Sequence, residues 1–415
     1  MDKFRKKYSE IVKHLKRKEF SIITGARQTG KTTLLKQLYS ELKQRNEEVW
    51  FLSFESSDIL EQINISPENL FKFVQRPDNP LYSKASDVSF ILIDEIQYAK
   101  DPTNFLKYLY DTYAPNLKII ATGSSAFYID SKFKDSLVGR KKIFTLSTLD
   151  FEEFLIFKER EELVQELELL RSDRKYLSLK YQEIEQLFDE YLIFGGYPAV
   201  VLIDDLAEKK EMLAEIKDSY IQKDIFESKV ENKDIFYKLM IVLASQTGSL
   251  LNKNELSKSL RMHLSTVERY IFVMQKSFHI SLIKPFYGNL KKEITKMPKV
   301  YFNDTGLRNI LISNFIDVEY RSDKGELLEN YVYTRLNEKF KEYEVKFWRT
   351  ADQKEVDFVI SSSVTGMEAF EVKFSSLNIK LSKYKKFQEL YPDIGLKFIT
   401  YNDSSEPKII QAIRL

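Results

Sequence analysis

The nine residues from 25 to 33, GARQTGKTT, leave few choices for the fold around them. They match the pattern G-x-x-x-x-G-K-[ST] and lie between an apolar run, FSIITG, and a segment with helical periodicity. In such a loop the backbone amides point at phosphate oxygens, the lysine reaches the terminal phosphates and the hydroxyl can hold Mg²⁺. We therefore expect a nucleotide to bind to the loop residues, which are Gly25, Ala26, Arg27, Gln28, Thr29, Gly30, Lys31, Thr32 and Thr33.

Strand-like and helix-like blocks alternate over the first 150 residues. Continuous apolar runs are typical of strands that are covered on both faces, and helices between them imply a parallel sheet with right-handed crossovers. The sequence therefore predicts an α/β fold class. The five predicted strands are FSIITG (20–25), EVWFLSF (48–54), SFILIDE (89–95), LKIIATG (117–123) and KKIFTLS (141–147).

The stretch FILIDEIQ places two carboxylates at the end of the third predicted strand. Asp94 and Glu95 follow four apolar residues, at the carboxyl end of the strand, where open α/β sheets bind their ligands. The aspartate can hold Mg²⁺ together with Thr32, and the glutamate can polarise the water that attacks a phosphate. The alternative is a pair of acids that only caps a strand. With the phosphate loop upstream, we interpret Asp94 as a metal ligand and Glu95 as catalytic.

Composition limits the class of protein. A chain of 415 residues, 43% hydrophobic and 30% charged, has room for roughly two to four domains. The formal net charge of +2 means that nucleic-acid binding must come from local patches. The absence of cysteine excludes disulfides and thiol catalysis, and the first ten residues, MDKFRKKYSE, contain no apolar signal core. We expect a cytoplasmic protein without membrane association.

Three further stretches fit a nucleotide site. IIATGSSA ends a strand in hydroxyls, so Ser124 or Ser125 could sense the γ-phosphate, although either serine could also cap a helix. LVGRKKIF offers Arg140 as an arginine finger, acting in its own site or across the interface of a homo-oligomer. The alternative for Arg140 is a surface base beside two lysines. FGGYPAV, which contains Pro198, resembles the glycine–proline motif near the base in related nucleotide-hydrolysing proteins.

Taken together, these stretches give the whole chain a resemblance to a large group of bacterial and archaeal ATPases. In that group an AAA-like, STAND-related P-loop core is joined to a winged helix and a C-terminal PD-(D/E)XK nuclease-like domain. The resemblance implies ATP and Mg²⁺ as cofactors, and a P-loop NTPase sheet followed by a helical lid. One departure is TLSTLDFEEFL, which lacks the proline that the group usually carries before its Ser-x-x-Glu-Phe stretch.

The middle of the chain is basic, since residues 229 to 299 contain thirteen Lys or Arg against five Asp or Glu. The stretch from 252 to 286 predicts a helix, a turn and a second helix opened by Ser265 or Thr266, and a hairpin follows as the wing. A basic winged helix suits duplex DNA, because it contacts phosphates and places its second helix in the major groove. The alternative is a packing module whose lysines are merely solvated. The predicted DNA contacts are Arg261, Arg269, Lys291 and Lys292.

Near the C-terminus, KEVDFVISSSVTGMEAFEVKF (354–374) predicts two short strands joined by a turn. Asp357 lies on the first strand, Glu371 and Lys373 lie on the second, and a preceding amphipathic helix carries Glu329. Helix glutamate, strand aspartate and Glu-x-Lys is the PD-(D/E)XK order. The resemblance implies that these four residues are catalytic, with Asp357 and Glu371 holding Mg²⁺ and Lys373 steadying the attacking water. Two alternatives are an exposed sheet edge with gatekeeper charges and a silent nuclease fold that serves as an adaptor.

The resulting prediction is an ATP-driven, DNA-associated machine or switch with a nuclease-like domain. Its rival is a nucleotide-controlled signalling adaptor that involves neither DNA nor cleavage. The predicted domains are a P-loop ATPase core (1–150), a helical lid (151–230), a winged helix (231–315) and an α/β restriction-endonuclease-like domain (316–415).

Overall fold

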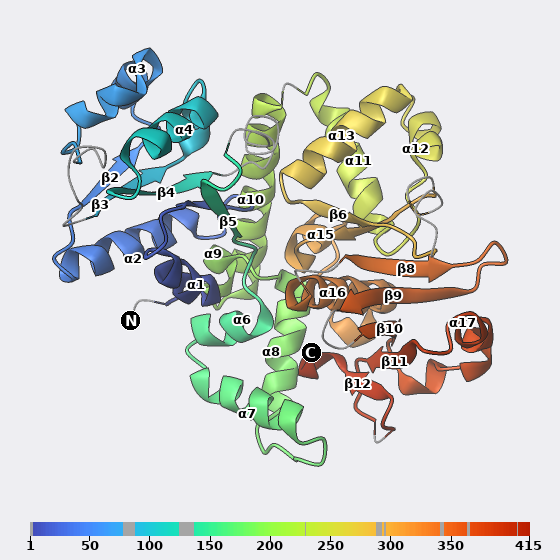
Figure 1. Cartoon of the computed structure of the whole chain (residues 1–415). Coiled ribbons are helices and arrows are strands. Elements are labelled where there is room, and N and C mark those ends of the chain that lie inside the picture. Colours follow the sequence, from blue (N-terminus) through green and yellow to red (C-terminus); the bar gives the residue numbers. More distant parts are fainter. Residues whose placement is uncertain are drawn as a thin grey trace. The chain divides into compact units, whose positions relative to one another are not determined.

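Five strands of the N-terminal part pair into one parallel sheet in the computed structural model of the protein (Figure 1). Their order across the sheet is β2-β3-β4-β1-β5, and every neighbouring pair is parallel. The parallel sheet predicted from the five apolar runs is confirmed. The strands are β1 (Phe20–Thr24), β2 (Val49–Ser53), β3 (Ser89–Asp94), β4 (Leu117–Gly123) and β5 (Lys141–Thr145).

Helices cover both faces of this sheet (Figure 1). On one face, α1 (Lys6–His14) and α2 (Lys31–Gln44) bury their leucines and isoleucines against the strands. On the other face, α3 (Ser57–Ile65) and α4 (Pro102–Tyr113) do the same, together with short 3-10 helices at Pro67–Lys72 and Ile96–Tyr98. The inner strands β1, β3 and β4 are buried on both faces and are therefore largely apolar, whereas the edge strand β5 fully buries only Phe144.

The structure describes residues 3–77, 88–123, 137–228, 230–287, 293, 296–340, 344–362, 366–404 and 406–415. The chain divides into two units, residues 1–148 with 276–278 and residues 149–275 with 279–415. The sheet above belongs to the first unit. Among the described helices, none combines the length and the apolar character that crossing a lipid bilayer requires.

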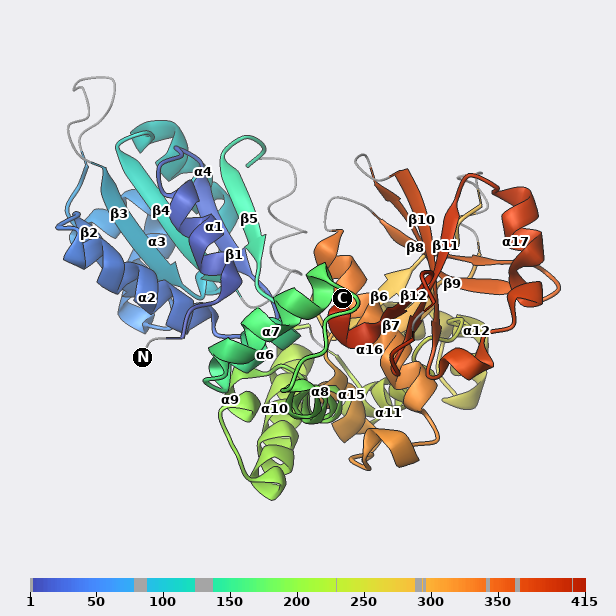
Figure 2. The same cartoon turned by 90° about the horizontal axis from the view of Figure 1, so that it is seen from below.

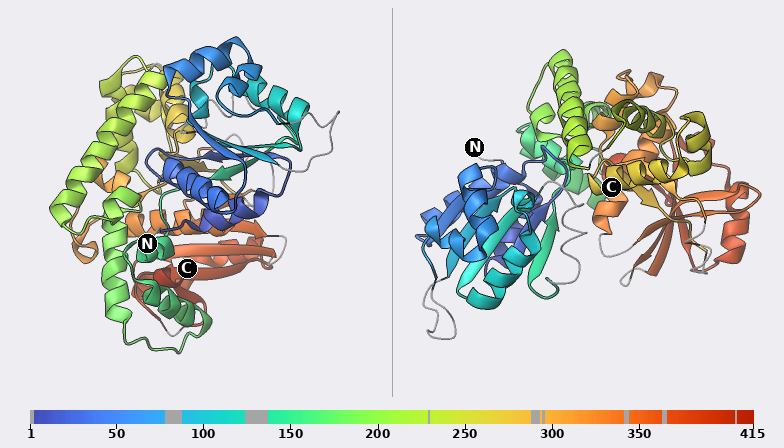
Figure 3. Two further views of the ribbon diagram at one scale, coloured as in Figure 1. Left: turned by 90° about the vertical axis from the view of Figure 1, so that its left-hand side faces the viewer. Right: turned by 90° about the horizontal axis from the view of Figure 1, so that it is seen from above.

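The second unit begins with a run of helices. A capping box opens α6, because the Asp150 carboxylate accepts from the Glu153 backbone N–H at 2.8 Å and the Glu153 carboxylate accepts from the Asp150 N–H at 3.3 Å. The last of these helices, α10, is one continuous 22-residue helix (Figure 3). The helices are α6 (Phe151–Phe157), α7 (Glu161–Ser172), α8 (Tyr181–Phe194), α9 (Pro198–Val201) and α10 (Leu206–Glu227).

Three helices and a small antiparallel sheet form the middle of the second unit. The strands β6 (Ile280–Ile283) and β7 (Lys299–Phe302) pair with each other, and Leu250 adds a bridge to Lys299. The second helix of the predicted pair begins at Leu264, one residue before the expected capping serine, and the His263 carbonyl accepts from the N–H groups of its first turn. The helices are α11 (Lys233–Ser245), α12 (Lys253–Ser259) and α13 (Leu264–Lys276).

The last part of the chain builds a mixed five-stranded sheet with the order β12-β11-β10-β9-β8 (Figure 2). Strand β9 is antiparallel to β8 and β10, whereas β10, β11 and β12 are parallel. The elements are α15 (Thr305–Leu311), α16 (Lys324–Lys339), β8 (Val345–Arg349), β9 (Glu355–Ser362), β10 (Gly366–Lys373), α17 (Lys385–Leu390), β11 (Gly395–Thr400) and β12 (Ile409–Gln411), with 3-10 helices at Val318–Tyr320, Ser376–Asn378, Leu381–Tyr384 and Ala412–Arg414.

Strands β9 and β10 are inner strands of this sheet, as is β11, and two of their acidic residues are buried. Asp357 is 6% exposed and Glu371 is 5% exposed. Continuing the β9–β10 register by one residue beyond Phe358 and Phe370 puts these two carboxylates opposite each other. The alternative of an exposed edge with solvated charges is therefore wrong, because an edge strand would leave its acids in water.

Candidate functional site

The loop between β1 and α2 wraps tightly around the end of its own strand. Gly25 has φ +149°, and a Cβ there would lie 2.0 Å from the Leu146 carbonyl oxygen, so only glycine fits. The next turn ends at Gly30, which has φ +91° and is followed directly by the first residue of α2, Lys31. The predicted phosphate loop therefore has the expected position, after a strand and at the N-terminus of a helix.

Lys31 is buried, and its ammonium group lies over the loop. Its Nζ donates to the carbonyl oxygens of Gly25 at 3.0 Å and Ala26 at 2.6 Å. Thr29 closes the same turn, because its hydroxyl donates to the Ala26 carbonyl at 2.9 Å. The lysine charge is thus fixed at the mouth of the loop, where it can meet the terminal phosphates of a nucleotide.

Thr32 and Asp94 meet beside the loop. The Thr32 hydroxyl lies 2.9 Å from Asp94 Oδ2 and 3.1 Å from Oδ1, although the two residues belong to α2 and to the end of β3. Thr122 of β4 donates to the same carboxylate from the other side. A hydroxyl and a carboxylate are hard oxygen ligands, so this pair fits a Mg²⁺ ion that arrives with a nucleotide. Thr122 was not predicted, because the expected hydroxyls were those of Ser124 and Ser125, directly after the strand.

Glu95 follows Asp94 in a left-handed backbone conformation, with φ +57°. Its N–H donates to the Thr122 hydroxyl at 3.0 Å, and its carboxylate accepts from the Gln97 amide. A non-glycine residue in this region is uncommon and is found at functional sites, where neighbouring contacts hold it. The side chain that we expect to activate water is therefore held in place by its backbone and by one neighbour.

Arg5 braces the loop and was not predicted. It is buried, and its guanidinium donates to the Thr29 carbonyl at 2.7 Å and to the Ser147 carbonyl at 2.8 Å. These contacts tie the segment before α1 to the phosphate loop and to the segment after β5. A lone arginine near the N-terminus gives no sequence signal for such a role, because its partners are backbone carbonyls far along the chain.

The structure does not bring Arg140 to this loop. Arg140 precedes β5, and its carbonyl accepts from the Phe20 N–H at 2.8 Å, at the start of β1, whereas the loop follows the end of that strand. The two ends of β1 are separated by roughly 13 Å. The guanidinium binds Asp111, with Nε 2.6 Å from Oδ1.

Ser124 and Ser125 lie outside the described residues, and Pro198 opens α9 in the second unit.

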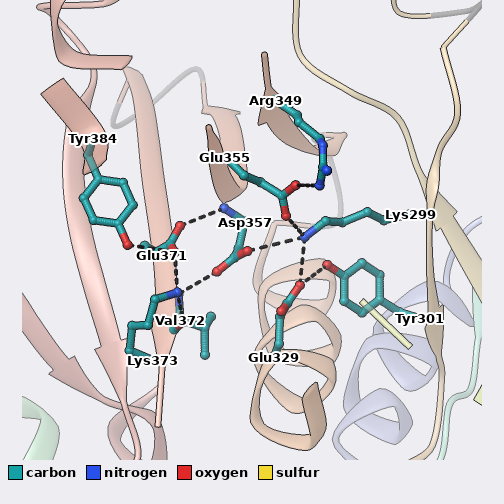
Figure 4. Close-up of polar contacts among 10 residues, drawn as sticks. All are labelled: Lys299, Tyr301, Glu329, Arg349, Glu355, Asp357, Glu371, Val372, Lys373 and Tyr384. Carbon is teal, nitrogen blue, oxygen red and sulfur yellow. Dashed lines mark hydrogen bonds and ion pairs between the residues drawn. The ribbon is translucent and has the colours of Figure 1, made fainter. Parts of the chain in front are cut away.

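The four residues predicted for the C-terminal domain lie in one cluster (Figure 4). Lys373 Nζ is 2.5 Å from Glu371 Oε1, which also accepts from the Tyr384 hydroxyl at 2.9 Å. Glu371 Oε2 accepts from the Asp357 N–H at 3.3 Å, and Asp357 Oδ2 accepts from the Val372 N–H at 2.9 Å. The order read from the sequence therefore corresponds to a real proximity of helix glutamate, strand aspartate and Glu-x-Lys.

A lysine from β7 enters this cluster. Lys299 Nζ lies 3.0 Å from Glu329 Oε1, 2.5 Å from Glu355 Oε1 and 3.4 Å from Asp357 Oδ1 (Figure 4). The Tyr301 hydroxyl donates to Glu329 at 2.6 Å, and Arg349 pairs with Glu355. Sequence reasoning missed Lys299, because it precedes Asp357 by 58 residues and belongs to another predicted domain.

The cluster does not fit a bound Mg²⁺ ion as it stands. Every carboxylate oxygen of Asp357 and Glu371 already has a protein donor within 3.4 Å. Within the described part of the chain, no group of three or more His, Asp or Glu side chains is arranged to hold a metal ion. To reach Asp357 Oδ1 or Glu371 Oε1 at about 2.1 Å, an ion would have to compete with the ammonium group of Lys299 or of Lys373.

Burial and mutual repulsion govern the titration of this cluster. Burial, and next the charge of Asp357, raises the pKa of Glu329 and of Glu371 above the ordinary range of a carboxyl group. Burial alone would lower the pKa of Lys299, but the attraction of Glu329 and its neighbours holds that pKa well above its usual value. Lys299 therefore stays protonated and supplies the compensating charge for the carboxylates around it.

Two of the four predicted DNA contacts can be located. Arg261, with φ +52°, is exposed in the turn between α12 and α13. Arg269 on α13 is half-exposed, and its guanidinium donates to the Ser228 carbonyl at 3.1 Å and lies 3.7 Å from Glu231. Lys291 and Lys292 lie outside the described residues.

Comparison with protein families divides the chain into three segments. Residues 17–155 match a model described as an AAA domain. Residues 185–317 and 324–414 match two models described as domains of unknown function, DUF8612 and DUF4143. The AAA match spans the parallel sheet, the phosphate loop and both carboxylates of its nucleotide site.

The chain is also similar to whole proteins. An uncharacterized protein of Methanocaldococcus jannaschii is 26% identical over 402 residues, which cover 94% of this chain and 84% of the relative. An uncharacterized protein of Haemophilus influenzae is 26% identical over 347 residues, covering 81% and 78%. Among solved structures, the ADP form of the Aeropyrum pernix ORC2 protein has a TM-score of 0.36 and 12% identity, covering 76% of this chain and 96% of that chain. This TM-score is below the level at which two chains share an overall fold. From the family match and the loop geometry we conclude that the N-terminal part of the chain is an AAA-type ATPase domain.

Proposed function

We propose that the protein binds ATP with Mg²⁺ at the loop of residues 25–33, hydrolyses it with Glu95, and uses the cycle to control a DNA-associated second unit with a nuclease-like C-terminal domain. The observation that carries the ATPase part is the convergence of three side chains beside one loop. Lys31, Thr32 and Asp94 come from a helix start and a strand end, and the Thr32–Asp94 contact is 2.9 Å.

Each residue of this site has a separate role in the proposed reaction. The loop amides and the Lys31 ammonium group bind the β- and γ-phosphates, and Thr32 with Asp94 would hold the ion. When bound, Mg²⁺ neutralises charge on the phosphate oxygens. Glu95 orients and polarises the attacking water, while Thr122 keeps the backbone of Glu95 and the carboxylate of Asp94 in position.

Glu95→Gln separates binding from hydrolysis. The amide keeps the size and the acceptor oxygen of the side chain but cannot take up a proton, so we expect ATP to stay bound while kcat falls by at least about 100-fold. ATP binding by calorimetry and phosphate release by a coupled assay give the two quantities. Gln97→Ala, which removes only the neighbour of Glu95, serves as the control and should change kcat much less. Hydrolysis by Glu95→Gln at the wild-type rate would remove Glu95 from its proposed role.

The DNA-associated part of the proposal is supported by residues 231–315. Three helices followed by an antiparallel strand pair form the arrangement expected of a winged helix, and the segment from 229 to 299 carries thirteen basic against five acidic residues. Arg261, exposed in the turn before α13, is suited to contact a phosphate. The C-terminal fold, with its helix glutamate, strand aspartate and Glu-x-Lys in one cluster, supports the nuclease-like assignment of residues 316–415.

A further inference from the structure

Lys299 occupies the centre of the carboxylate cluster in the C-terminal domain. Its side chain is 2% exposed, and its ammonium group lies within 3.4 Å of carboxylate oxygens from one helix and one strand. The Lys299 ammonium group also lies over the Phe347 ring, with Nζ 5.7 Å from the ring centre. A lysine buried to this extent is unusual unless it is paired, and here it has three carboxylate partners, Glu329, Glu355 and Asp357.

An ammonium group and a Mg²⁺ ion exclude each other at this point. Both are cations, and both would compete for Asp357 Oδ1, which lies 3.4 Å from Lys299 Nζ. Asp357 lies between Lys299 and the Glu371–Lys373 pair (Figure 4). The cluster sets three cations, Lys299, Arg349 and Lys373, against four carboxylates, so most of the negative charge that would attract the ion is already compensated. Removing one partner of such a buried group is costly, because it leaves the other charges unpaired.

We propose that Lys299 is the built-in cation of this cluster and that it keeps Mg²⁺ away from Asp357 and Glu371. As long as β7 holds Lys299 in the cluster, the C-terminal domain works as a binding module without a metal ion. The inference rests on the proposed nuclease-like identity of residues 316–415, which is the reason to expect a metal ion there.

The test measures Mn²⁺ binding to the full chain without nucleotide, by the loss of the free-ion paramagnetic resonance signal and by the shift in Tm. Lys299→Met keeps the length of the side chain and removes its charge. We expect this variant to melt roughly 5–10 °C below the wild type. Lys299→Met should gain one saturable Mn²⁺ site, and binding of the ion should restore about half of the lost Tm. Adding Asp357→Asn to this variant should abolish the site. Lys397→Met, which breaks the 2.6 Å pair with Glu368 on the same sheet, is the control and should gain no site.

Two results would overturn the inference. One is Mn²⁺ binding by the wild-type chain that Asp357→Asn removes. The other is a folded Lys299→Met chain that binds no Mn²⁺. If Lys299→Met does not fold, the double variant Lys299→Met/Glu329→Gln takes its place, because it removes one charge of each sign. The double variant should fold and bind Mn²⁺. Its failure to fold in millimolar Mn²⁺ would also contradict the proposal. ATP hydrolysis, measured in the same wild-type sample, reports on the ATPase assignment independently of the Mn²⁺ result.

Discussion

Arg140 and Asp111 form an ion pair at the end of the N-terminal sheet that lies away from the phosphate loop. If Arg140 is an arginine finger, it acts on the nucleotide of a neighbouring copy of the chain. A finger contributes in the transition state, so Arg140→Ala should lower kcat at least about tenfold and leave ATP affinity nearly unchanged.

Mixing two variants tests this arrangement. Lys31→Ala supplies Arg140 but no working loop, whereas Arg140→Ala supplies the loop, so a mixture should recover part of the activity that each variant lacks alone. Asp111→Ala, which removes the partner and keeps the arginine, is the matched control and should not lower kcat as Arg140→Ala does. A wild-type rate for Arg140→Ala, or identical losses in both variants, would assign Arg140 to the surface pair only.

At the scale of single residues, the sequence predicted the positions of those side chains that a short motif determines. Lys31, Thr32 and Asp94 lie where the sequence placed them, because a strand, a glycine-rich turn and a helix start leave little freedom. Arg5 could not be predicted, since its partners are backbone carbonyls, nor could Lys299, whose partners follow 30 to 58 residues later in the chain. Contacts of that separation depend on how elements pack, which residue spacing does not specify.

At the scale of elements, a partly buried carboxylate on α8 is hydrogen-bonded to the residue that follows β11. Asp189 accepts a hydrogen bond from the Tyr401 hydroxyl at 2.6 Å, and burial raises the pKa of Asp189 to about 6. Because the folded-state pKa lies above the unfolded one, the folded chain binds the proton more tightly between about pH 4 and pH 6. Stability contributed by this group therefore falls as the pH rises through that window.

Asp189→Asn tests this linkage. The amide keeps an acceptor oxygen for Tyr401 and removes the charge, so we expect the variant to exceed the wild type in free energy of unfolding by about 1 kcal/mol at pH 7.5, allowing for the partial exposure of the group. The advantage should shrink towards pH 4.5, where the wild-type carboxyl is protonated in the folded chain. Urea denaturation at both pH values gives the two differences, and an equal difference at both would contradict the assigned pKa.

The predicted binding of duplex DNA involves the turn between α12 and α13 and the helix α13. Each lysine or arginine that neutralises a phosphate adds about one to the slope of log affinity against log salt, so Arg261→Ala should weaken duplex binding and lower that slope by roughly one. Arg269→Ala should have a smaller effect, because Ser228 and Glu231 already engage its guanidinium. Arg45→Ala is the control, because Arg45 is a half-exposed arginine directly after α2 that pairs with Glu41. Salt-independent affinity in the wild type would favour the adaptor alternative.

The sequence predicted where the strands lie along the chain better than it predicted which strands pair. The five strands of the N-terminal sheet were predicted because each is a continuous apolar run, and all five are present. The inner position of β9 and β10 could not be decided from their sequence, because alternating charge on a strand is equally compatible with a solvated edge and with buried ion pairs. The pairing of β9 with β8 and of β10 with β11 shows that both strands are inner strands.

At the scale of the whole molecule, the chain combines one AAA-type domain with two segments that match separate models of unknown function. Within the second unit these two segments share the Lys299 cluster, since Lys299 belongs to residues 185–317 and its partners to residues 324–414. The proposed nucleotide site lies in the first unit, and the Lys299 cluster joins the two later segments.

We propose that the loop of residues 25–33 binds ATP through the charge of Lys31. Calorimetric titration of ATP with Mg²⁺ into the full chain and into Lys31→Ala measures it directly, with Lys36→Ala, an exposed lysine further along α2, as the matched control. We predict one ATP per chain in the wild type and in the control, and an affinity at least about tenfold lower, or about 1.4 kcal/mol, in Lys31→Ala. Equal affinity of Lys31→Ala and wild type, or no heat of binding in the wild type, would contradict the account.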